Sequence, residues 1–289
     1  MAVIDSHQHL WNPSRVTYDW LGPDLAPINR AIEFPELAPL LAATGVERTV
    51  LVQSADNAAD TAYMFEVAAA HPEIAAVVGW VPLDDPDVVA QDLPVLRANP
   101  VFAGIRNLIH TRPDPDWLLR SDVDASLGIL AAAGVPFDVV SVLPRHLEHV
   151  PVLSERHPEL RMVIDHLSKP PIGADSDEPW RTLIARAAEN PRVFAKVSGL
   201  YPAVGDMAGW TAADVRPYLA TALELFGADR LMFGGDWPIS VLAGGYVRVW
   251  QELSILFDEL APAERTAILG GTAAAFYGIP AERLPGGPS

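Results

Sequence analysis

The chain has 289 residues, of which 50% are hydrophobic and 20% charged, a balance typical of a globular protein with a sizeable core. It contains no cysteine, which excludes disulfides, cysteine-bound zinc, iron–sulfur clusters and a thiol nucleophile. The formal net charge of −17 disfavours nucleic acid and anionic membranes as partners, so we expect a small-molecule ligand.

The start of the chain has no basic stretch followed by an apolar run, so no signal peptide is expected. The longest apolar run, residues 74–83, is far shorter than the roughly 20 residues that span a bilayer. These two features predict a cytoplasmic location, and the oligomeric state stays open.

Eight short apolar runs recur along the chain. They are nearly continuous in apolar residues, which is typical of strands buried on both faces of a parallel sheet. The predicted strands cover residues 3–4, 48–53, 75–83, 102–109, 136–142, 161–164, 193–198 and 231–233.

Segments with apolar residues at three- and four-residue spacing lie between these strands. Gly45 and Gly134 are expected to end two of the helices, whereas His146 and His149 are expected at a helix surface. A further amphipathic segment, residues 263–276, is expected to pack on the outside or the bottom of the fold. The predicted helices cover residues 36–43, 60–70, 88–98, 124–133, 144–156, 180–189, 213–226 and 247–260.

The alternation of eight strands with eight helices predicts an α/β fold, a (β/α)8 TIM barrel. The alternative is an open, doubly wound sheet, but its glycine-rich turn after the first strand is replaced here by Ser6-His7-Gln8-His9. No low-complexity linker divides the chain. Residues 1–289 are therefore expected to form a single domain, with residues 284–289 as a loose tail.

The candidate catalytic residues follow the first, sixth and eighth predicted strands, whose carboxyl ends meet at one mouth of a barrel. His7 and His9 are two residues apart and point the same way, which suits binding of one metal ion or polarisation of a carbonyl. His166 and Lys169 leave the sixth strand. Asp236 follows two glycines after the eighth, where a carboxylate can accept a proton from water, bind a metal, or do both.

Five motifs in order resemble the amidohydrolase superfamily, and more narrowly its lactonase-like group of sugar lactonases and pyrone-dicarboxylate hydrolases. The resemblance implies an amidohydrolase-type barrel and an enzyme that hydrolyses the carboxylic ester bond of a lactone. The motifs are Asp5-Ser6-His7-Gln8-His9-Leu10-Trp11, Gly104-Ile105-Arg106, Pro115-Asp116-Trp117-Leu118, Asp165-His166-Leu167-Ser168-Lys169-Pro170 and Phe233-Gly234-Gly235-Asp236-Trp237-Pro238.

The chain departs from those members of the superfamily that bind two metal ions. Such members supply a lysine or glutamate from strand four and a histidine from strand five, but here the fourth predicted strand offers arginine and asparagine and the fifth has no histidine. We therefore expect at most one divalent ion, such as zinc, on His7, His9 and Asp236, with His166 as a fourth ligand. A metal-free mechanism is the alternative.

These residues fit a mechanism in which Asp236 takes a proton from the water that attacks the lactone carbonyl. His7 and His9, or an ion that they hold, stabilise the oxyanion, and Asp236 or His166 returns the proton to the departing ring oxygen. The predicted substrate-binding residues are Arg106, Lys169, Gln53, Trp20, Trp80, His110 and Trp237.

The expected substrate is the lactone of a sugar acid, such as fucono- or rhamnonolactone, and the negative net charge favours a neutral one. The alternatives are hydrolysis of a carboxylated pyrone or muconolactone, an amidohydrolase-type decarboxylation, and a barrel that binds a ligand without catalysis. An aspartate beside three histidines argues against the last, because binding alone needs no base.

Overall fold

The computed structural model describes residues 2–202 and 206–286 and confirms the predicted α/β barrel. Parallel strands follow one another around the barrel in chain order, from β1 to β8. After β8 the chain returns to β1. There the backbone N–H of His9 donates to the Trp237 carbonyl oxygen, and that of Asp236 donates to the His7 carbonyl oxygen. The strands are β1 Ile4–Gln8, β2 Arg48–Val52, β3 Ile74–Gly79, β4 Phe102–Asn107, β5 Phe137–Val139, β6 Met162–Ile164, β7 Val193–Val197 and β8 Leu231–Phe233.

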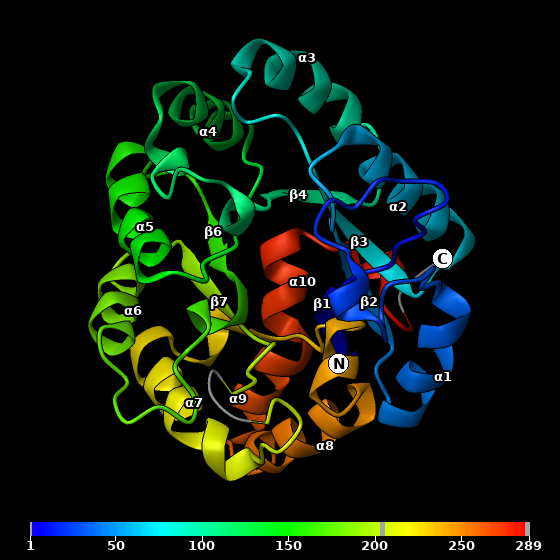
Figure 1. Cartoon of the computed structure of the whole chain (residues 1–289), viewed down its shortest axis with the longest axis vertical. Coiled ribbons are helices and arrows are strands. Elements are labelled where there is room, and N and C mark those ends of the chain that lie inside the picture. Colours follow the sequence, from blue (N-terminus) through cyan, green and yellow to red (C-terminus); the bar gives the residue numbers. More distant parts are fainter. Residues whose placement is uncertain (1, 203–205, 287–289) are drawn as a thin grey trace.

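Helices form a ring around the barrel (Figure 1). As predicted, Gly45 and Gly134 end α1 and α4 in the left-handed conformation, with φ of 72° and 67°. No helix among the described residues has both the length and the apolar character that crossing a membrane requires. The ring consists of α1 Phe34–Thr44, α2 Ala58–Ala70, α3 Pro86–Arg97, α4 Ser121–Ala133, α5 Pro144–Arg156, α6 Trp180–Ala188, α7 Ala212–Phe226 and α8 Tyr246–Phe257.

Strand β1 extends beyond the predicted residues 3–4. Its further residues are polar and so interrupt the apolar pattern, but they are buried inside the barrel. Each finds a partner there. Ser6 Oγ donates to the Phe233 carbonyl oxygen at 2.6 Å, and Asp5 Oδ2 accepts from the Tyr246 hydroxyl at 2.8 Å. The apolar signal therefore missed the part of the strand that carries candidate site residues.

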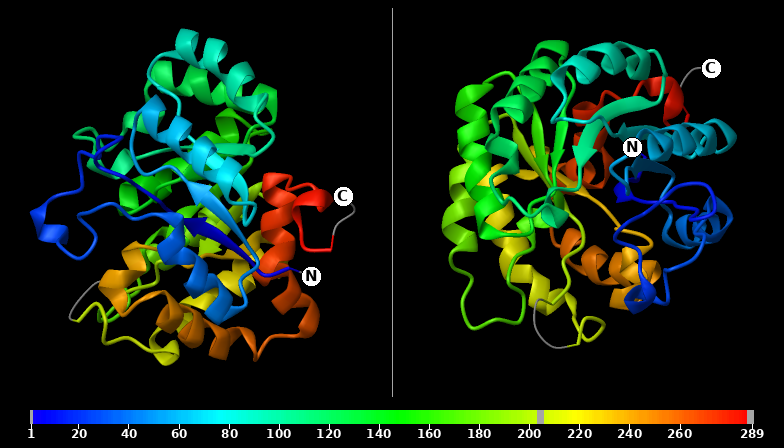
Figure 2. Two further views of the ribbon diagram at one scale, coloured as in Figure 1. Left: turned by 90° about the vertical axis from the view of Figure 1, so that its right-hand side faces the viewer. Right: turned by 45° about the horizontal axis from the view of Figure 1, so that its top comes forward.

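The predicted segment 263–276 is broken in the structure, into α9 Pro262–Thr266, a π-helical turn Ala267–Gly271, and α10 Thr272–Tyr277. A Cβ on Gly270 would lie 2.2 Å from the Ala2 carbonyl oxygen, so only glycine allows this approach to the start of the chain. Helix α10 packs at the amino-terminal ends of the strands, on the right of the left view in Figure 2, and the loop after β1 extends from the opposite end, on the left of that view. Of the predicted loose tail, Leu284 packs against this layer, and residues 287–289 lie outside the described residues.

The prediction that His146 and His149 lie at the surface is wrong. Both are on α5 and are only 2% and 1% exposed. The loop before α4 contacts α5, and His149 Nε2 lies 2.9 Å from Asp116 Oδ1 of that loop. Helical spacing alone cannot show that a loop will cover a polar face.

Candidate active site

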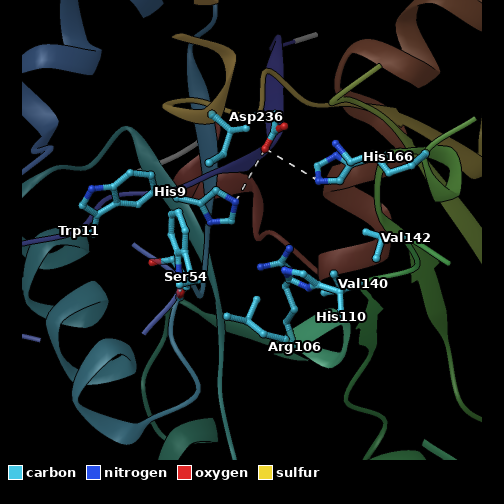
Figure 3. Close-up of a pocket in the computed structure, with 13 residues that line it drawn as sticks. His9, Trp11, Ser54, Arg106, His110, Val140, Val142, His166 and Asp236 are labelled. Atoms are coloured by element: carbon cyan, nitrogen blue, oxygen red, sulfur yellow. Dashed lines mark hydrogen bonds and ion pairs between the residues drawn. The ribbon is translucent and has the colours of Figure 1, made fainter. Parts of the chain in front are cut away.

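A cavity of about 160 Å³ opens at the carboxyl ends of the strands (Figure 3). It is smaller than the roughly 300–1,000 Å³ typical of pockets for drug-sized ligands, so it suits a molecule with a single small ring. Its lining combines aromatic and aliphatic walls with polar groups at the base. The lining residues are His9, Trp11, Trp20, Ser54, Arg106, Leu108, His110, Val140, Val142, His166, Lys169, Asp236 and Ile239.

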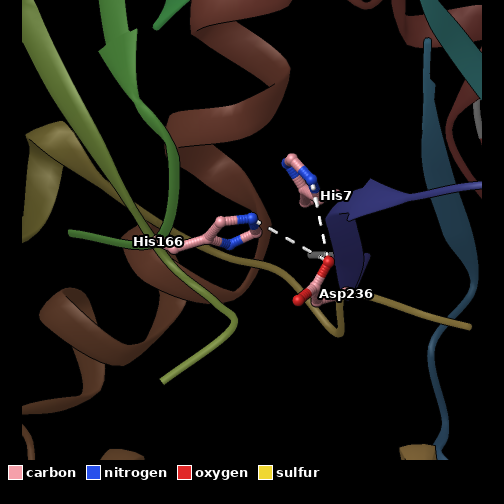
Figure 4. Close-up of side chains that lie close together, drawn as sticks. All are labelled: His7, His166 and Asp236. Atoms are coloured by element: carbon pink, nitrogen blue, oxygen red, sulfur yellow. Dashed lines mark ion pairs between the residues drawn. The ribbon is translucent and has the colours of Figure 1, made fainter. Parts of the chain in front are cut away.

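The structure brings together the four side chains that the sequence singled out. The Nε2 atoms of His7, His9 and His166 each lie 3.9 Å from Asp236 Oδ1, and those of His7 and His9 lie 3.1 Å apart. Figure 4 shows His7 and His166 beside Asp236, and Figure 3 shows His9. All four side chains are buried or nearly so. Nitrogen and carboxylate ligands thus converge on one point.

The remaining ring nitrogen of each histidine is fixed by a neighbour outside this cluster. His9 Nδ1 donates to the Val52 carbonyl oxygen at 2.8 Å, which leaves a lone pair on its Nε2. His166 Nδ1 lies 2.8 Å from Ser198 Oγ, and His7 Nδ1 lies 3.3 Å from Asp165 Oδ1. Such contacts hold ligating histidines in orientation, so the cluster fits one divalent ion.

Among the described residues, the group whose ligand atoms all lie within 4.8 Å of one another is His7, His166 and Asp236. The sequence assigned His9 to the three principal ligands and His166 to a fourth position. In the structure His166 belongs to the tight group, while His9 is a further nitrogen at 3.9 Å from the same carboxylate oxygen. The spacing of His7 and His9 along β1 could not reveal how closely His166, which follows β6, approaches Asp236.

A buried charge network lies beneath the cluster. Lys196 Nζ lies 2.6 Å from Asp138 Oδ2 and 3.1 Å from Asp165 Oδ1, and 3.0 Å from His7 Nδ1. Arg106 Nε donates to Asp165 Oδ2 at 2.8 Å. Burial alone would raise the pKa of Asp165, but Lys196, His7 and Arg106 hold it well below its usual value. In the sequence, this network is indicated by a charged residue in each of two apolar strands, Asp138 in β5 and Lys196 in β7.

Replacing Lys196 by methionine should lower the free energy of unfolding by about 3–5 kcal/mol, because two buried carboxylates lose their ammonium partner. Urea unfolding at neutral pH measures this loss. Arg30→Met is the control, since Arg30 pairs with Glu36 at the surface and should contribute no more than about 1 kcal/mol. Equal losses in the two variants would contradict the role of Lys196 in this network.

An unusual backbone turn carries two of the cavity residues. His166, Leu167, Ser168 and Lys169 have consecutive φ values of 56°, 49°, 60° and 49°, all in the left-handed region. For residues other than glycine this conformation costs roughly 1–2 kcal/mol each, and such strain clusters at functional sites. Asp236, with φ of 52°, shares it.

Glycines let this strained backbone close around the cluster. Neither Gly234 nor Gly235, which precede Asp236, has a positive φ. They permit close approach, because a Cβ on Gly234 would lie 2.8 Å from His7 Cβ. At Gly199, with φ of 56°, a Cβ would lie 2.6 Å from His166 Nδ1 and 2.9 Å from Asp236 Oδ2.

Burial dominates the electrostatics of the cluster. It raises the pKa of Asp236 to about 7, although Lys169 and Arg106 oppose the rise. Burial, with Lys196 next, lowers the pKa of His7 to about 3, and burial lowers that of His166 well below the usual value. The imidazoles are therefore neutral at pH 7, beside a carboxyl group that titrates close to that pH.

Four of the predicted substrate-binding residues line the cavity: Arg106, Lys169, Trp20 and His110. The structure places the other three elsewhere. Gln53 Nε2 donates to the Arg106 carbonyl oxygen at 3.0 Å, and the buried Trp237 follows Asp236 with its carbonyl bonded to His9 N. Trp80 follows β3 and is absent from the lining.

Sequence reasoning missed several residues that face the cavity. Ser54 Oγ is buried and has no hydrogen-bond partner within the described residues, so it can bond to a ligand hydroxyl. Val140 and Val142, beyond β5, and Ile239, beyond β8, add apolar side chains to the lining. Ser54 directly follows Gln53, the residue predicted at the end of β2, and lines the cavity where Gln53 does not.

The chain is similar to several known proteins. A family model described as amidohydrolase matches residues 4–279. An L-fucono-1,5-lactonase of Burkholderia ambifaria is 38% identical over 281 residues, covering 96% of this chain and 95% of that protein. An L-fucono-1,5-lactonase of Burkholderia multivorans is 34% identical over 293 residues, covering 96% of each. The crystal structure of a Burkholderia multivorans amidohydrolase with bound zinc is 32% identical, with a TM-score of 0.86, and covers 97% of this chain and 100% of that one.

Proposed function

The chain belongs to the amidohydrolase family, and we propose that it is a lactonase, a hydrolase that opens the ring of a sugar-acid lactone. The observation that carries this proposal is the buried carboxylate of Asp236, with Oδ1 at 3.9 Å from the Nε2 atoms of three histidines beside a small cavity. The similarity to two L-fucono-1,5-lactonases supports lactone opening as the reaction.

Asp236 acts as the general base in this proposal. Its carboxylate accepts a proton from water while the water oxygen bonds to the lactone carbonyl carbon. The intermediate then breaks its bond to the ring oxygen, and Asp236 returns the proton to that oxygen, since burial keeps His166 neutral. The product is a hydroxy acid, which ionises and releases one proton for each ring opened.

Two cations at the cavity, Arg106 and Lys169, stabilise the negative charge that develops on the carbonyl oxygen. Arg106 is held by Asp165, and Lys169 Nζ donates to the Gly199 carbonyl oxygen at 3.1 Å. Both are therefore positioned before substrate binds. Positioned donors of this kind need no reorganisation during the reaction.

The same cluster would hold one divalent ion, with zinc as the proposed metal. His7, His166 and Asp236 would be its ligands, and His9 a further one. A bound ion would supply Lewis-acid polarisation of the carbonyl. The zinc-bound relative supports this choice, as do the histidine orientations fixed from outside the cluster.

The cavity favours a neutral sugar lactone over a dicarboxylate. Ser54 and His110 can bond to hydroxyl groups, and the side chains of Val140 and Val142 can contact a methyl group, as in the lactone of a deoxy sugar. The charge of Arg106 is already balanced by Asp165, which leaves less positive charge for two substrate carboxylates.

The test is acid release, followed with a pH indicator, from a panel of lactones at pH 7 with spontaneous hydrolysis subtracted. We expect turnover of L-fucono-1,5-lactone or a related six-carbon lactone, with pyrone dicarboxylates hydrolysed more slowly. Carbon dioxide from an aromatic acid, with no acid from any lactone, would overturn the proposal in favour of a decarboxylase. A lactone that binds but stays unchanged would indicate a binding protein.

We expect kcat/KM to fall about tenfold per pH unit below pH 7 when a chelator is present. Only the ionised carboxylate accepts a proton, and burial raises the pKa of Asp236 to about 7, so protonation at lower pH removes the base. Adding zinc should shift this fall in kcat/KM to lower pH, because a nearby cation favours the ionised form of the carboxyl group. Initial rates from about pH 5 to 7.5 measure it. A flat profile in both conditions would contradict this role of Asp236.

A further inference from the structure

We infer that Trp180, at the start of α6 and outside the cavity, is a positioning residue for His166 and Lys169. Its indole Nε1 donates to the Leu167 carbonyl oxygen at 2.6 Å, in the middle of the left-handed turn. Trp180 is 5% exposed, and it does not touch the cavity. The kinetic part of this inference rests on the proposed lactonase function.

The turn cannot hold its own shape, because none of its residues is glycine and all are in the left-handed region. Its internal support is the bond from Lys169 N to the His166 carbonyl oxygen, at 2.9 Å. Contacts from outside must therefore supply the rest. Ser168 Oγ lies 2.6 Å from Ser141 Oγ beyond β5, and Trp180 secures the intervening carbonyl of Leu167.

Trp180 is itself held in place by α7. Its ring packs edge to face against Tyr218, with ring centres 5.3 Å apart. The Tyr218 hydroxyl donates to the Pro171 carbonyl oxygen at 3.1 Å, just beyond the turn. Two neighbouring aromatic side chains thus bind the same segment at Leu167 and at Pro171.

The two ends of the turn carry different tasks in the cavity. His166 points to Asp236 and bonds to Ser198, whereas Lys169 lies at the cavity and donates to the Gly199 carbonyl oxygen. If the turn relaxed to a right-handed conformation, both side chains would leave these partners together. Loosening Trp180 should therefore change both proton transfer and substrate binding.

The test compares Trp180→Phe with Trp210→Phe. Each change keeps an aromatic ring and removes one buried indole bond, since Trp210 Nε1 donates to the Ala243 carbonyl oxygen at 3.1 Å and not to the turn. For Trp180→Phe we expect kcat to fall at least tenfold and KM to rise at least threefold. A merely structural defect lowers the number of active molecules and leaves KM unchanged, which is the result expected for Trp210→Phe.

A second readout does not depend on activity. The imidazole resonances of His166, assigned with His166→Gln, should shift or broaden in Trp180→Phe and stay in place in Trp210→Phe. If no lactone is turned over, this comparison still decides the inference. Unchanged resonances, or an unchanged KM in an active Trp180→Phe, would overturn it. If Trp180→Phe does not fold, Tyr218→Phe, which loses the bond to Pro171, decides by the same criteria.

Discussion

Asp236→Asn should lower kcat for lactone opening by roughly 10²–10⁴-fold, the usual contribution of a positioned general base. The amide keeps the shape of the carboxyl group but cannot accept the proton from water at neutral pH. The fold should remain intact. Burial disfavours the charged form of Asp236, and Oδ2 has no hydrogen-bond partner within the described residues, so a neutral side chain removes an electrostatic penalty.

The matched control for this variant is Asp60→Asn. Asp60 is also buried, and burial raises its pKa to about 6, but its oxygens accept from Ser54 N, Ala55 N and the Tyr18 hydroxyl, and Asp60 itself does not line the cavity. Its replacement should affect unfolding more than kcat. Initial rates and thermal unfolding of both variants give the comparison. Near-normal turnover by Asp236→Asn would rule out the base role.

The sequence identified the cluster because barrel topology constrains where strands end. Once eight alternating units are recognised, residues such as His7, His166 and Asp236, which follow different strands, must lie at one mouth. In such a barrel the strands follow one another in chain order, so the strand order needs no separate prediction. This is why the sequence alone predicts that side chains more than 150 residues apart share one site.

The sequence was less informative about which side chains turn inward. Gln53 and Trp80 follow strands as expected, yet the Gln53 side chain bonds to the Arg106 carbonyl oxygen and Trp80 is absent from the cavity lining, whereas the neighbouring Ser54 lines the cavity. The pairing of Lys196 with Asp138 depends on the register between β5 and β7, which are separated by β6. The residue pattern within a single strand does not predict the register between two strands.

The left-handed turn at residues 166–169 was equally invisible in the sequence. Its residues have no preference for positive φ, so propensity predicts a different backbone there. Tertiary contacts override that propensity at the place where His166 and Lys169 reach the cavity. Departures from local rules are expected at functional sites, where surrounding structure offsets the strain.

Gly199→Ala should lower kcat/KM by at least about 100-fold, a typical consequence of displacing reacting groups by about 1 Å. The added Cβ would lie 2.6 Å from His166 Nδ1 and 2.9 Å from Asp236 Oδ2, so both side chains must shift. Neither can retreat freely. His166 is held by Ser198 and by the left-handed turn, and Asp236 has its own backbone in the left-handed region.

Gly134→Ala separates this clash from backbone strain. Gly134 has φ of 67°, close to the 56° of Gly199, but a Cβ there meets nothing within 4 Å. The alanine at residue 134 should therefore lower the free energy of unfolding by about 1–2 kcal/mol and leave kcat/KM unchanged. The alanine at residue 199 should show the same strain together with the loss of activity. Equal kcat/KM in the two variants would mean that His166 and Asp236 need not meet as closely as the structure places them, and the proposed proton transfer would lose its geometric basis.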